Sequence, residues 1–385
     1  MQPAVPRKIL LIAGERSGDR LAARVISEAK KIAAGKNISV KFFGVAGDGC
    51  RSQGMECFHD IREMSVVGFL EVAKRYGFFR RVFTQMTALL DDPHTKPDAV
   101  ILVDYPGFNI RFAAQAKRRG IEVIYYVSPQ VWAWKPSRVK KIVASVSRML
   151  VIFPFEVDIY KHAGLLQTEF VGHPLVEILA DERAKFVTRE TFAAKFGLDV
   201  SKEWLLLFPG SRNEEVRRHI HVMTDAAKLL VAKLNVQPII VESSTVNNEL
   251  YVTGGNDVIC FRSETDIHEL MYHSQLGILK SGTTTLEAAL SELPGVICYR
   301  TSWPTYWMAR MLVKLKFIGL ANIVLGKKLY PELLQSEMTA ENIADAIVDV
   351  NSKRDVFKNE LHEINVHLES HDASSSRRVA AYLFR

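Results

Sequence analysis

Short apolar runs alternate with amphipathic helical stretches along nearly the whole chain. The runs of the first half read ILLIAG, VKFFGVAG, AVILVDYPGFN, EVIYYVSPQVWAW, RMLVIFPFE and TEFVGHP; those of the second read WLLLFPGSR, QPIIVES, DVICFRS, QLGILKSG and PGVICYR. Because they are almost continuously apolar rather than alternating, they predict parallel strands covered by helices on both faces. We therefore expect an α/β protein with two Rossmann-like, doubly wound domains that face a central cleft.

The two series of strands are separated by a polar, helical passage from about Pro174 to Leu198. This passage predicts a first domain at residues 1–175 and a second at residues 176–352. The remaining residues, 353–385, read as a helical tail that returns to the first domain or reaches a partner subunit in a homodimer.

Length and charge set broad limits. A chain of 385 residues can build two substantial cores. The net charge of +7 suits a phosphorylated substrate, a nucleic acid or an acidic membrane surface, although scattered solvated lysines explain it equally well. The four cysteines form no CxxC pair, so no metal cage or disulfide framework is indicated, and a reducing cytoplasm is the simplest setting. No stretch approaches the roughly 20 apolar residues of a membrane-spanning helix.

Two turns of the second half have the features of anion-binding loops. In LLLFPGSRNEE, a strand runs through Gly210 and Ser211 into a helix start, and Arg212 can clamp phosphate oxygens. An ordinary turn with a surface arginine explains the same residues. Since no GxxxxGK[ST] motif occurs, a P-loop ATPase is disfavoured.

The second turn, in ILKSGTTTLEAAL, combines a glycine with hydroxyl side chains before a helix. Glu287 lies in the first turn of that helix, where its carboxylate can accept hydrogen bonds from ribose hydroxyls. Capping threonines with a glutamate that stabilises the helix dipole are the plainer explanation. Together with the first turn, however, this one fits a nucleoside diphosphate. The residues concerned are Ser281, Gly282, Thr283 and Thr284.

The first half carries carboxylates where a phosphate loop would be expected. GERSGD places Glu15 and Asp19 after the first strand, and VDYPGFN places Asp104 at the end of a buried strand. A carboxylate at such a position is costly unless it is partnered or used. Helix capping is a structural explanation for the presence of Asp104, and it explains Asp19 more readily. Carboxylates also suit sugar hydroxyls, and one of them can remove a hydroxyl proton. Ser17 and Asp19 are the candidate acceptor-binding residues.

Aromatic residues raise two further questions. Trp132 and Trp134 are able to stack on a sugar ring, but we favour a core position for them, and His173 is also more simply structural. The stretch MSVVGFLEVAKRYGFFRRVFTQM is apolar over a wide arc and interleaved with basic residues, which favours a helix at an anionic bilayer surface. A buried helix with arginines at its ends fits equally well. The candidate membrane patch comprises Val66, Val67, Phe69, Leu70, Phe78, Phe79, Arg80 and Arg81.

The order and spacing of AGERSGD, VDYPGFN, YVSPQVWAW, FPFE, GHP, FPGSR, SGTTTLE and ELLQ resemble those of the lipid-A-disaccharide synthase family. The resemblance runs from about Lys8 into the C-terminal tail. It implies a GT-B glycosyltransferase that joins UDP-2,3-diacylglucosamine to 2,3-diacylglucosamine 1-phosphate with inversion, forms the β-1,6-linked lipid A disaccharide and releases UDP. It also implies a cytoplasmic enzyme, peripheral on the inner face of the inner membrane, that needs no metal or cofactor and binds no nucleic acid.

By position, the family's functional acid corresponds to Asp104 and its loop glutamate to Glu15. The first domain would then bind the acceptor. The donor-binding residues of the second domain correspond to Arg212, Glu287 and Asn322. Lys280 stands where a small residue is usual, and the usual LPN reads Leu320-Ala321-Asn322. These departures concern the shape of the donor loop, not the class of reaction.

Three other functions share some of these features. A UDP-sugar epimerase of the same architecture would use similar donor loops, and a basic membrane- or RNA-binding protein would explain the charge. A dinucleotide-dependent oxidoreductase is disfavoured because GERSGD does not fit GxGxxG.

Overall fold

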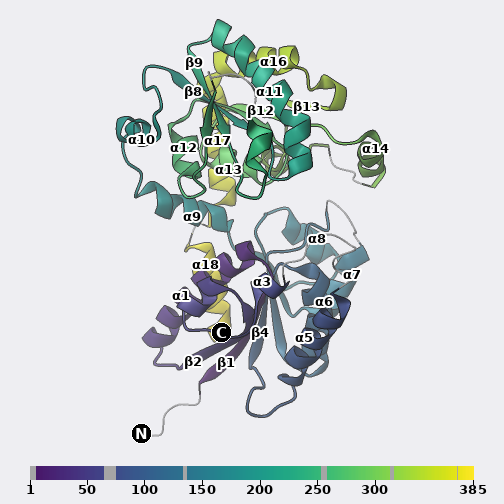
Figure 1. The fold of residues 1–385 in the computed structure, drawn as a ribbon. Coiled ribbons are helices and arrows are strands. Elements are labelled where there is room, and N and C mark those ends of the chain that lie inside the picture. The colour runs from purple at the N-terminus through teal and green to yellow at the C-terminus, as the bar shows by residue number, and fades with distance from the viewer. Residues whose placement is uncertain (1–5, 65–74, 133–136, 253–257, 313–315, 371) are drawn as a thin grey trace. The chain divides into compact units, whose positions relative to one another are not determined.

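The structure is a computed structural model that describes residues 6–64, 75–132, 137–252, 258–312, 316–370 and 372–385. The chain divides into two compact units. The first comprises Met1–Pro174 with Leu368–Arg385, and the second comprises Leu175–His367. Each is a sheet flanked by helices (Figure 1).

A seven-stranded parallel sheet, in the order β3-β2-β1-β4-β5-β6-β7, forms the centre of the first unit. The chain builds outward from β1 to β3 and then from β4 to β7, so the topological switch point lies between β1 and β4. The strands are β1 (Arg7–Ala13), β2 (Val40–Ala46), β3 (Glu56–Asp60), β4 (Ala99–Val103), β5 (Glu122–Tyr126), β6 (Arg148–Val151) and β7 (Thr168–Phe170).

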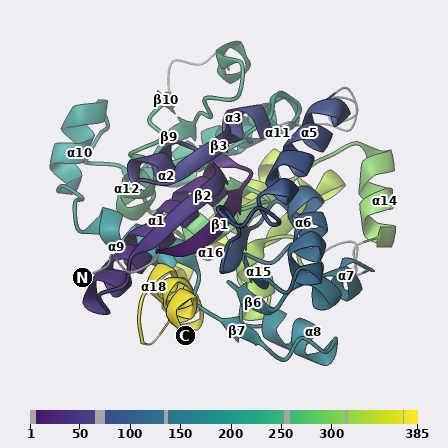
Figure 2. The ribbon, with the colours of Figure 1, turned by 90° about the horizontal axis from the view of Figure 1, so that it is seen from below.

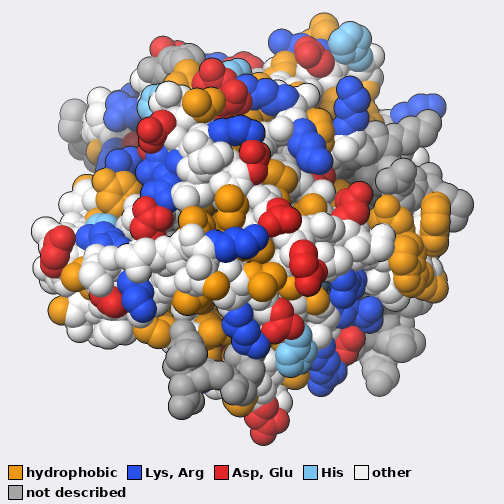
Figure 3. Space-filling view, turned by 90° about the horizontal axis from the view of Figure 1, so that it is seen from above, with side chains coloured by type: hydrophobic (Ala, Val, Ile, Leu, Met, Phe, Trp, Pro, Cys, Tyr) orange, Lys and Arg blue, Asp and Glu red, His pale blue; other side chains and the backbone are white. Residues whose placement is uncertain are grey.

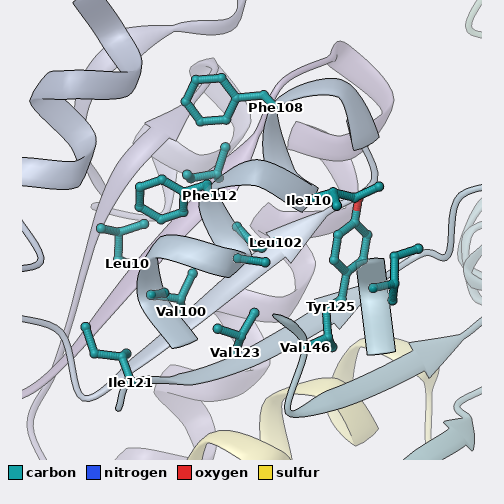
Figure 4. Packing of buried hydrophobic residues seen from close by; sticks show 14 of the residues in the cluster. Leu10, Val100, Leu102, Phe108, Ile110, Phe112, Ile121, Val123, Tyr125 and Val146 are labelled. Carbon is teal, nitrogen blue, oxygen red and sulfur yellow. The ribbon is translucent and has the colours of Figure 1, made fainter. Parts of the chain in front are cut away.

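Helices cover both faces of this sheet because its central strands are apolar on both sides; every residue of β4 is buried. Figure 4 shows Phe112 of α6 close to the strand residues Leu10 and Val100, with Phe108 one helical turn away from it. Burying each such ring stabilises the unit by about 1.5–3 kcal/mol. The helices are α1 (Arg16–Gly35), α2 (Asp48–Ser52), α3 (Ile61–Met64), α5 (Tyr76–Ala88), α6 (Pro106–Arg118), α7 (Ser137–Ser145), α8 (Glu156–His162), α18 (Ser375–Ala381) and the 3-10 turn η3 (Tyr382–Phe384).

The end of the chain belongs to the first unit. The backbone N–H of His173 donates to Leu368 O over 2.8 Å, and the Ser375 hydroxyl donates to Gly172 O over 3.0 Å. Gly172 has a φ of 89°, and a Cβ there would stand 2.7 Å from Ser370 Cβ, so only glycine fits this crossing. Helix α18 then lies beside α1 (Figures 1 and 2).

The second unit contains a six-stranded parallel sheet in the order β10-β9-β8-β11-β12-β13. Its switch point lies between β8 and β11. The strands are β8 (Glu203–Phe208), β9 (Val236–Val241), β10 (Ile259–Phe261), β11 (Leu276–Lys280), β12 (Gly295–Tyr299) and β13 (Glu332–Leu334).

The helical elements of the second unit pack on both faces of that sheet, with α11 and α16 side by side. The largest fully buried side chain, Trp204, donates its indole N–H to Asp199 O over 3.0 Å. The elements are α9 (Pro174–Arg183), α10 (Arg189–Phe196), α11 (Asn213–Lys233), η1 (Asn248–Tyr251), α12 (Ile267–His273), α13 (Thr284–Leu290), α14 (Trp303–Leu312), α15 (Leu320–Leu325), η2 (Gln335–Glu337), α16 (Ala340–Ser352) and α17 (Arg354–Leu368).

The predicted α/β architecture with two parallel sheets is confirmed, whereas the cleft between the domains stays a prediction. Two strands were missed. β3 has half-exposed residues and β13 is only three residues long, so neither gives the continuous apolar signal of the central strands. Among the described residues, no helix is both long and apolar enough to traverse a bilayer.

The packing of α6 gives a stability prediction. Phe112→Ala removes a fully buried ring, and we expect the free energy of unfolding to fall by about 3–5 kcal/mol because a cavity remains. Tyr76→Ala, at a side chain that is 63% exposed, is the control and should change it by less than about 0.5 kcal/mol. Chemical unfolding measures both variants; equal effects would contradict the assigned packing.

Candidate active site

The two acidic motifs of the first unit meet at one edge of its sheet. Strands β1 and β4 pair in parallel, with Ala13 opposite Val103. Glu15 and Asp104 follow these residues directly and therefore emerge together at the topological switch point, where ligands of such sheets bind.

The backbone at Asp104 is held in an unusual conformation. Asp104 and Tyr105 have φ values of 46° and 48°, in the left-handed region that side-chain-bearing residues rarely adopt. The Asp104 carbonyl accepts hydrogen bonds from the Tyr125 hydroxyl at 2.6 Å and from Asn109 Nδ2 at 2.8 Å. The Asp104 N–H donates to Tyr126 O over 3.0 Å. These bonds offset the strain and fix the direction in which the carboxylate leaves the sheet.

The Asp104 carboxyl has a pKa raised to about 6. Burial is the main cause, since it disfavours the charged form, and the negative charge of Glu15 adds to it. A hydrogen bond from the Tyr105 backbone acts in the opposite direction. A carboxylate with this pKa is largely ionised at neutral pH and basic enough to accept a hydroxyl proton.

The glycine of GERSGD is required by Tyr105. A Cβ at Gly14 would stand 2.3 Å from the Tyr105 ring. The Tyr105 hydroxyl donates to Met64 O over 3.0 Å, which keeps the ring in place. Glu15 follows in an extended conformation as the exposed N-cap residue of α1, with no hydrogen bond from its side chain to the helix backbone.

Asp19 is buried, and its carboxylate is hydrogen-bonded to the backbone of a neighbouring loop. It accepts hydrogen bonds from the backbone N–H groups of Gly47, Gly49 and Cys50 at 2.8, 2.9 and 3.2 Å. It thereby ties α1 to the loop after β2, and the role of Asp19 in binding an acceptor stays a prediction. Ser17, by contrast, is exposed in the first turn of α1.

The SPQVW, FPFE and GHP motifs converge at the ends of β5, β6 and β7. The Glu156 carboxylate accepts from Trp132 Nε1 at 3.1 Å and from the Phe153 N–H at 3.2 Å. Burial raises the pKa of Glu156 to about 7. It lowers the pKa of His173 to about 3. The His173 ring centre lies 5.2 Å from that of the Phe153 ring. These contacts link the ends of the three strands. Trp132 is half-buried, and Trp134 lies outside the described residues.

In the second unit, the FPGSR and SGTTT loops also meet at a switch point, because β8 and β11 pair with Phe208 opposite Leu279. Gly210 has a φ of 150°, and a Cβ there would lie 2.5 Å from Glu215 Cβ. Arg212 is the N-cap of α11, and its side chain is 76% exposed. Its guanidinium is therefore free to turn toward a bound anion.

The SGTT turn is anchored by its hydroxyl groups. The Ser281 hydroxyl donates to Ile318 O over 3.0 Å, and the Thr285 hydroxyl donates to Gly282 O over 2.8 Å. Gly282 has a φ of 139°, which favours glycine. The other predicted donor residues of this segment, Thr283, Thr284 and Glu287, follow in and just before α13.

A pocket of about 160 Å³ lies between these two loops. Gly210 and Ser211 line one side, and Lys280 and Thr284 line another. The end of β9 adds the buried Glu242, whose Oε2 lies 2.6 Å from Arg262 Nε. The predicted donor loops are thus brought together around one cavity.

Asn322 is completely buried beneath these loops. Its Nδ2 donates to Tyr330 O and Glu332 Oε1, both at 2.9 Å, and its Oδ1 accepts from the N–H groups of Leu329 and Tyr330 at 3.0 and 2.9 Å. Both ends of the amide are therefore occupied by the protein. Glu332 in turn accepts hydrogen bonds from the N–H groups of Ile318 and Gly319. Because the Ser281 hydroxyl donates to Ile318 O, Asn322 indirectly supports the segment that holds Ser281.

Sequence reasoning missed the residues that hold the loops. Tyr125 and Asn109 clamp Asp104, while Glu215 and Glu332 organise the donor loops. Glu215 carries a recognisable signal, a second acidic residue in the first turn of a helix. The others serve through tertiary contacts that no local pattern indicates.

The candidate membrane patch is described only in part. Val66, Val67, Phe69 and Leu70 lie outside the described residues. In α5, Phe78 and Phe79 are half-buried and pack against the core, whereas Arg80 and Arg81 are exposed.

Two parallel, doubly wound units define a GT-B protein, and solved structures agree. The UDP-GlcNAc 2-epimerase of Neisseria meningitidis bound to UDP-GlcNAc aligns with a TM-score of 0.68 at 12% identity, covering 98% of this chain and 99% of that one. The calicheamicin glycosyltransferase CalG4 aligns with a TM-score of 0.61 at 14% identity, covering 99% of both chains. At such identities these likenesses show the fold alone.

The lipid-A-disaccharide synthetase family model matches residues 9–383, so the chain belongs to that family of glycosyltransferases. The lipid-A-disaccharide synthase of Geobacter metallireducens is 39% identical over 352 residues, which cover 90% of this chain and 88% of the relative. Lipid-A-disaccharide synthase 1 of Legionella pneumophila is 36% identical over 380 residues, covering 96% and 95%. The expected family and enzyme class are confirmed.

The pKa of Asp104 predicts the pH dependence of activity. If its ionised form is needed, kcat/KM should fall as the pH drops through about 6. Glu15→Gln removes a charge that raises this pKa, so the acid limb should move to lower pH. Glu122→Gln, at the opposite end of the sheet, should leave the limb in place. A limb unmoved by Glu15→Gln would contradict the coupling.

The hydrogen bonds of Asn322 predict an indirect effect on the donor. Asn322→Ala leaves the Leu329 and Tyr330 N–H groups and Glu332 without their partner, so the melting temperature should fall by several degrees and KM for the donor should rise. Asn342→Ala, at an exposed helix start, is the control. A raised KM with unchanged thermal stability would instead indicate direct contact with the donor.

Proposed function

We propose that this glycosyltransferase condenses UDP-2,3-diacylglucosamine with 2,3-diacylglucosamine 1-phosphate to give the β-1,6-linked lipid A disaccharide 1-phosphate and UDP. Membership of the family supports the reaction. The observation that carries the assignment of roles is the contrast between the two switch points: carboxylates at that of the first unit, and an arginine with an amide-rich turn at that of the second.

In this proposal, the first unit binds the acceptor and Asp104 is the general base. Its carboxylate removes the proton of the acceptor 6-hydroxyl, and the oxygen attacks the anomeric carbon opposite to UDP, which inverts that centre. Burial and a raised pKa favour Asp104 over Glu15 as the base, because the Glu15 side chain is exposed. Glu15 then keeps the pKa of Asp104 high and orients the sugar, with Ser17 nearby in the same helical turn.

The second unit would hold the donor. As the bond to the sugar breaks, negative charge develops on the leaving diphosphate. Arg212 and the backbone N–H groups of the SGTT turn are suitably charged or polar to stabilise it. Glu287, half-buried in α13, would accept hydrogen bonds from the ribose hydroxyls.

Asp104→Asn tests the catalytic role. Asparagine keeps the shape and tolerates the left-handed backbone, so the fold should persist while kcat falls roughly 10²–10⁴-fold and the Kd for UDP changes less than threefold. Asp91→Asn, at an exposed ion pair with Arg119, is the matched control and should retain full turnover. Release of UDP and formation of the disaccharide are measured together. Undiminished turnover of Asp104→Asn would show that Asp104 is not the general base. Formation of an epimerised sugar without disaccharide would indicate that the protein is a UDP-sugar epimerase instead.

We also propose peripheral association with the inner face of the inner membrane, since both substrates carry acyl chains. Two described surfaces support this. Arg80 and Arg81 are exposed beside Phe78 and Phe79, and α14 exposes Trp303 and Trp307 by 54% and 59%. Tryptophan and arginine both suit the interface of an anionic bilayer. Hydrophobic side chains also gather at the right-hand edge of Figure 3, the side on which Figure 1 draws α14.

Replacing aromatic residues of either surface by serine should weaken binding to anionic vesicles. The double variants are Phe78→Ser with Phe79→Ser, and Trp303→Ser with Trp307→Ser; flotation with phosphatidylglycerol vesicles measures the bound fraction. Leu166→Ser, at a side chain that is 69% exposed elsewhere, should bind as before. Undiminished binding of both double variants would exclude these surfaces as the membrane contact.

A further inference from the structure

Lys280, the last residue of β11, stands at the wall of the donor pocket. Its side chain is only 15% exposed, although lysine is strongly hydrated and rarely buried without a reason. A cation is thus placed in the wall of the pocket that lies between the two donor loops.

The ammonium group is held by Glu215. Glu215 Oε2 accepts hydrogen bonds from Lys280 Nζ and from the Ser211 N–H, both at 3.1 Å. One carboxylate oxygen thus links the FPGSR loop to the residue that precedes the SGTT turn. The other, Oε1, lies 3.9 Å from Arg212.

This placement brings the lysine onto the SGTT turn itself. Lys280 Nζ lies 3.4 Å from the point where a Cβ would stand at Gly282. An ammonium group has three donors, and among the described residues Glu215 is its hydrogen-bond partner through one of them. The remaining donors are available to a ligand in the pocket.

The donors of Lys280 that Glu215 leaves unused favour an anion as that ligand. Lys280 compensates the charge of Glu215, and Arg262 compensates that of Glu242 in the same pocket wall. The exposed Arg212 of the FPGSR loop adds a positive charge, and Glu264, which also lines the pocket, adds a negative one. A buried ammonium beside an amide-rich turn gains more from a phosphate than an exposed one does, because less water screens the interaction.

We propose that Lys280 is a further ligand of the donor's diphosphate in this chain, with Glu215 as its positioning residue. The ammonium donates to diphosphate oxygens in the bound donor and in the departing UDP, beside Arg212. This inference rests on the proposed donor site of the second unit and adds a further diphosphate ligand to it.

The test compares UDP with uridine, which lacks the diphosphate. Binding of UDP is measured by calorimetry and that of uridine by displacement, on the full chain. Lys280→Met and Lys280→Ser should weaken UDP about tenfold and change uridine less than twofold. Lys280→Arg retains the charge and should keep UDP affinity within about threefold of the wild type. Serine is small and polar, so Lys280→Ser provides a second neutral variant if Lys280→Met fails to fold.

Lys228→Met is the matched control. Lys228 lies on α11 in the same unit and pairs with Asp225 at the exposed surface, so its loss should leave UDP affinity unchanged. Unchanged UDP binding in both neutral Lys280 variants, or an equal loss for UDP and uridine, would show a purely structural ion pair and overturn the inference. Wild-type protein that does not bind UDP would instead overturn the proposed donor site itself.

Discussion

The parallel pairing of β1 with β4, and of β8 with β11, is the constraint on which the rest of the structure depends. At each of these positions the chain leaves two neighbouring strands toward opposite sides, which opens space at the carboxyl edge of the sheet. The GERSGD, VDYPGFN, FPGSR and SGTT loops all begin there, whereas Asn322 lies in α15. Were either pair separated by another strand, its two motifs would stand about 10 Å apart rather than side by side.

The two switch points have similar backbones but opposite chemistry. In the first unit, burial and the neighbouring charge of Glu15 make the Asp104 carboxylate unusually basic. The strained backbone of Asp104 and Tyr105 persists because Tyr125 and Asn109 bind its carbonyl. In the second unit, the loops present backbone N–H groups, hydroxyls and cations. A transfer that takes a proton from one sugar and leaves charge on a diphosphate needs this division.

Buried polar residues hold the loops in shape. Asp19 binds three backbone N–H groups, Asn322 uses its whole amide, and Glu215 links the two donor loops. Each would be costly to bury without its partners, so each favours a single loop conformation. The same logic explains Lys280: a cation is tolerated in the pocket wall because Glu215 is already there.

The sequence by itself determined the class of fold, the positions of the central strands and the candidate loops that follow them. Continuous apolar runs and glycine-containing turns are local patterns, and β1, β4, β8 and β11 all follow them. The apolar pattern did not predict β3 or β13, because β3 is partly exposed and β13 has only three residues.

Only the tertiary structure decided which polar side chains of each motif are occupied by other parts of the protein and which are exposed. Asp19 and Asn322 look like ligands in the sequence, yet neighbouring backbone groups occupy them. Glu215 and Tyr125 look ordinary, yet they position the loops. The physical reason is that a polar side chain takes its role from the partners that folding brings within hydrogen-bond distance. In a parallel α/β sheet, most of those partners are distant in sequence.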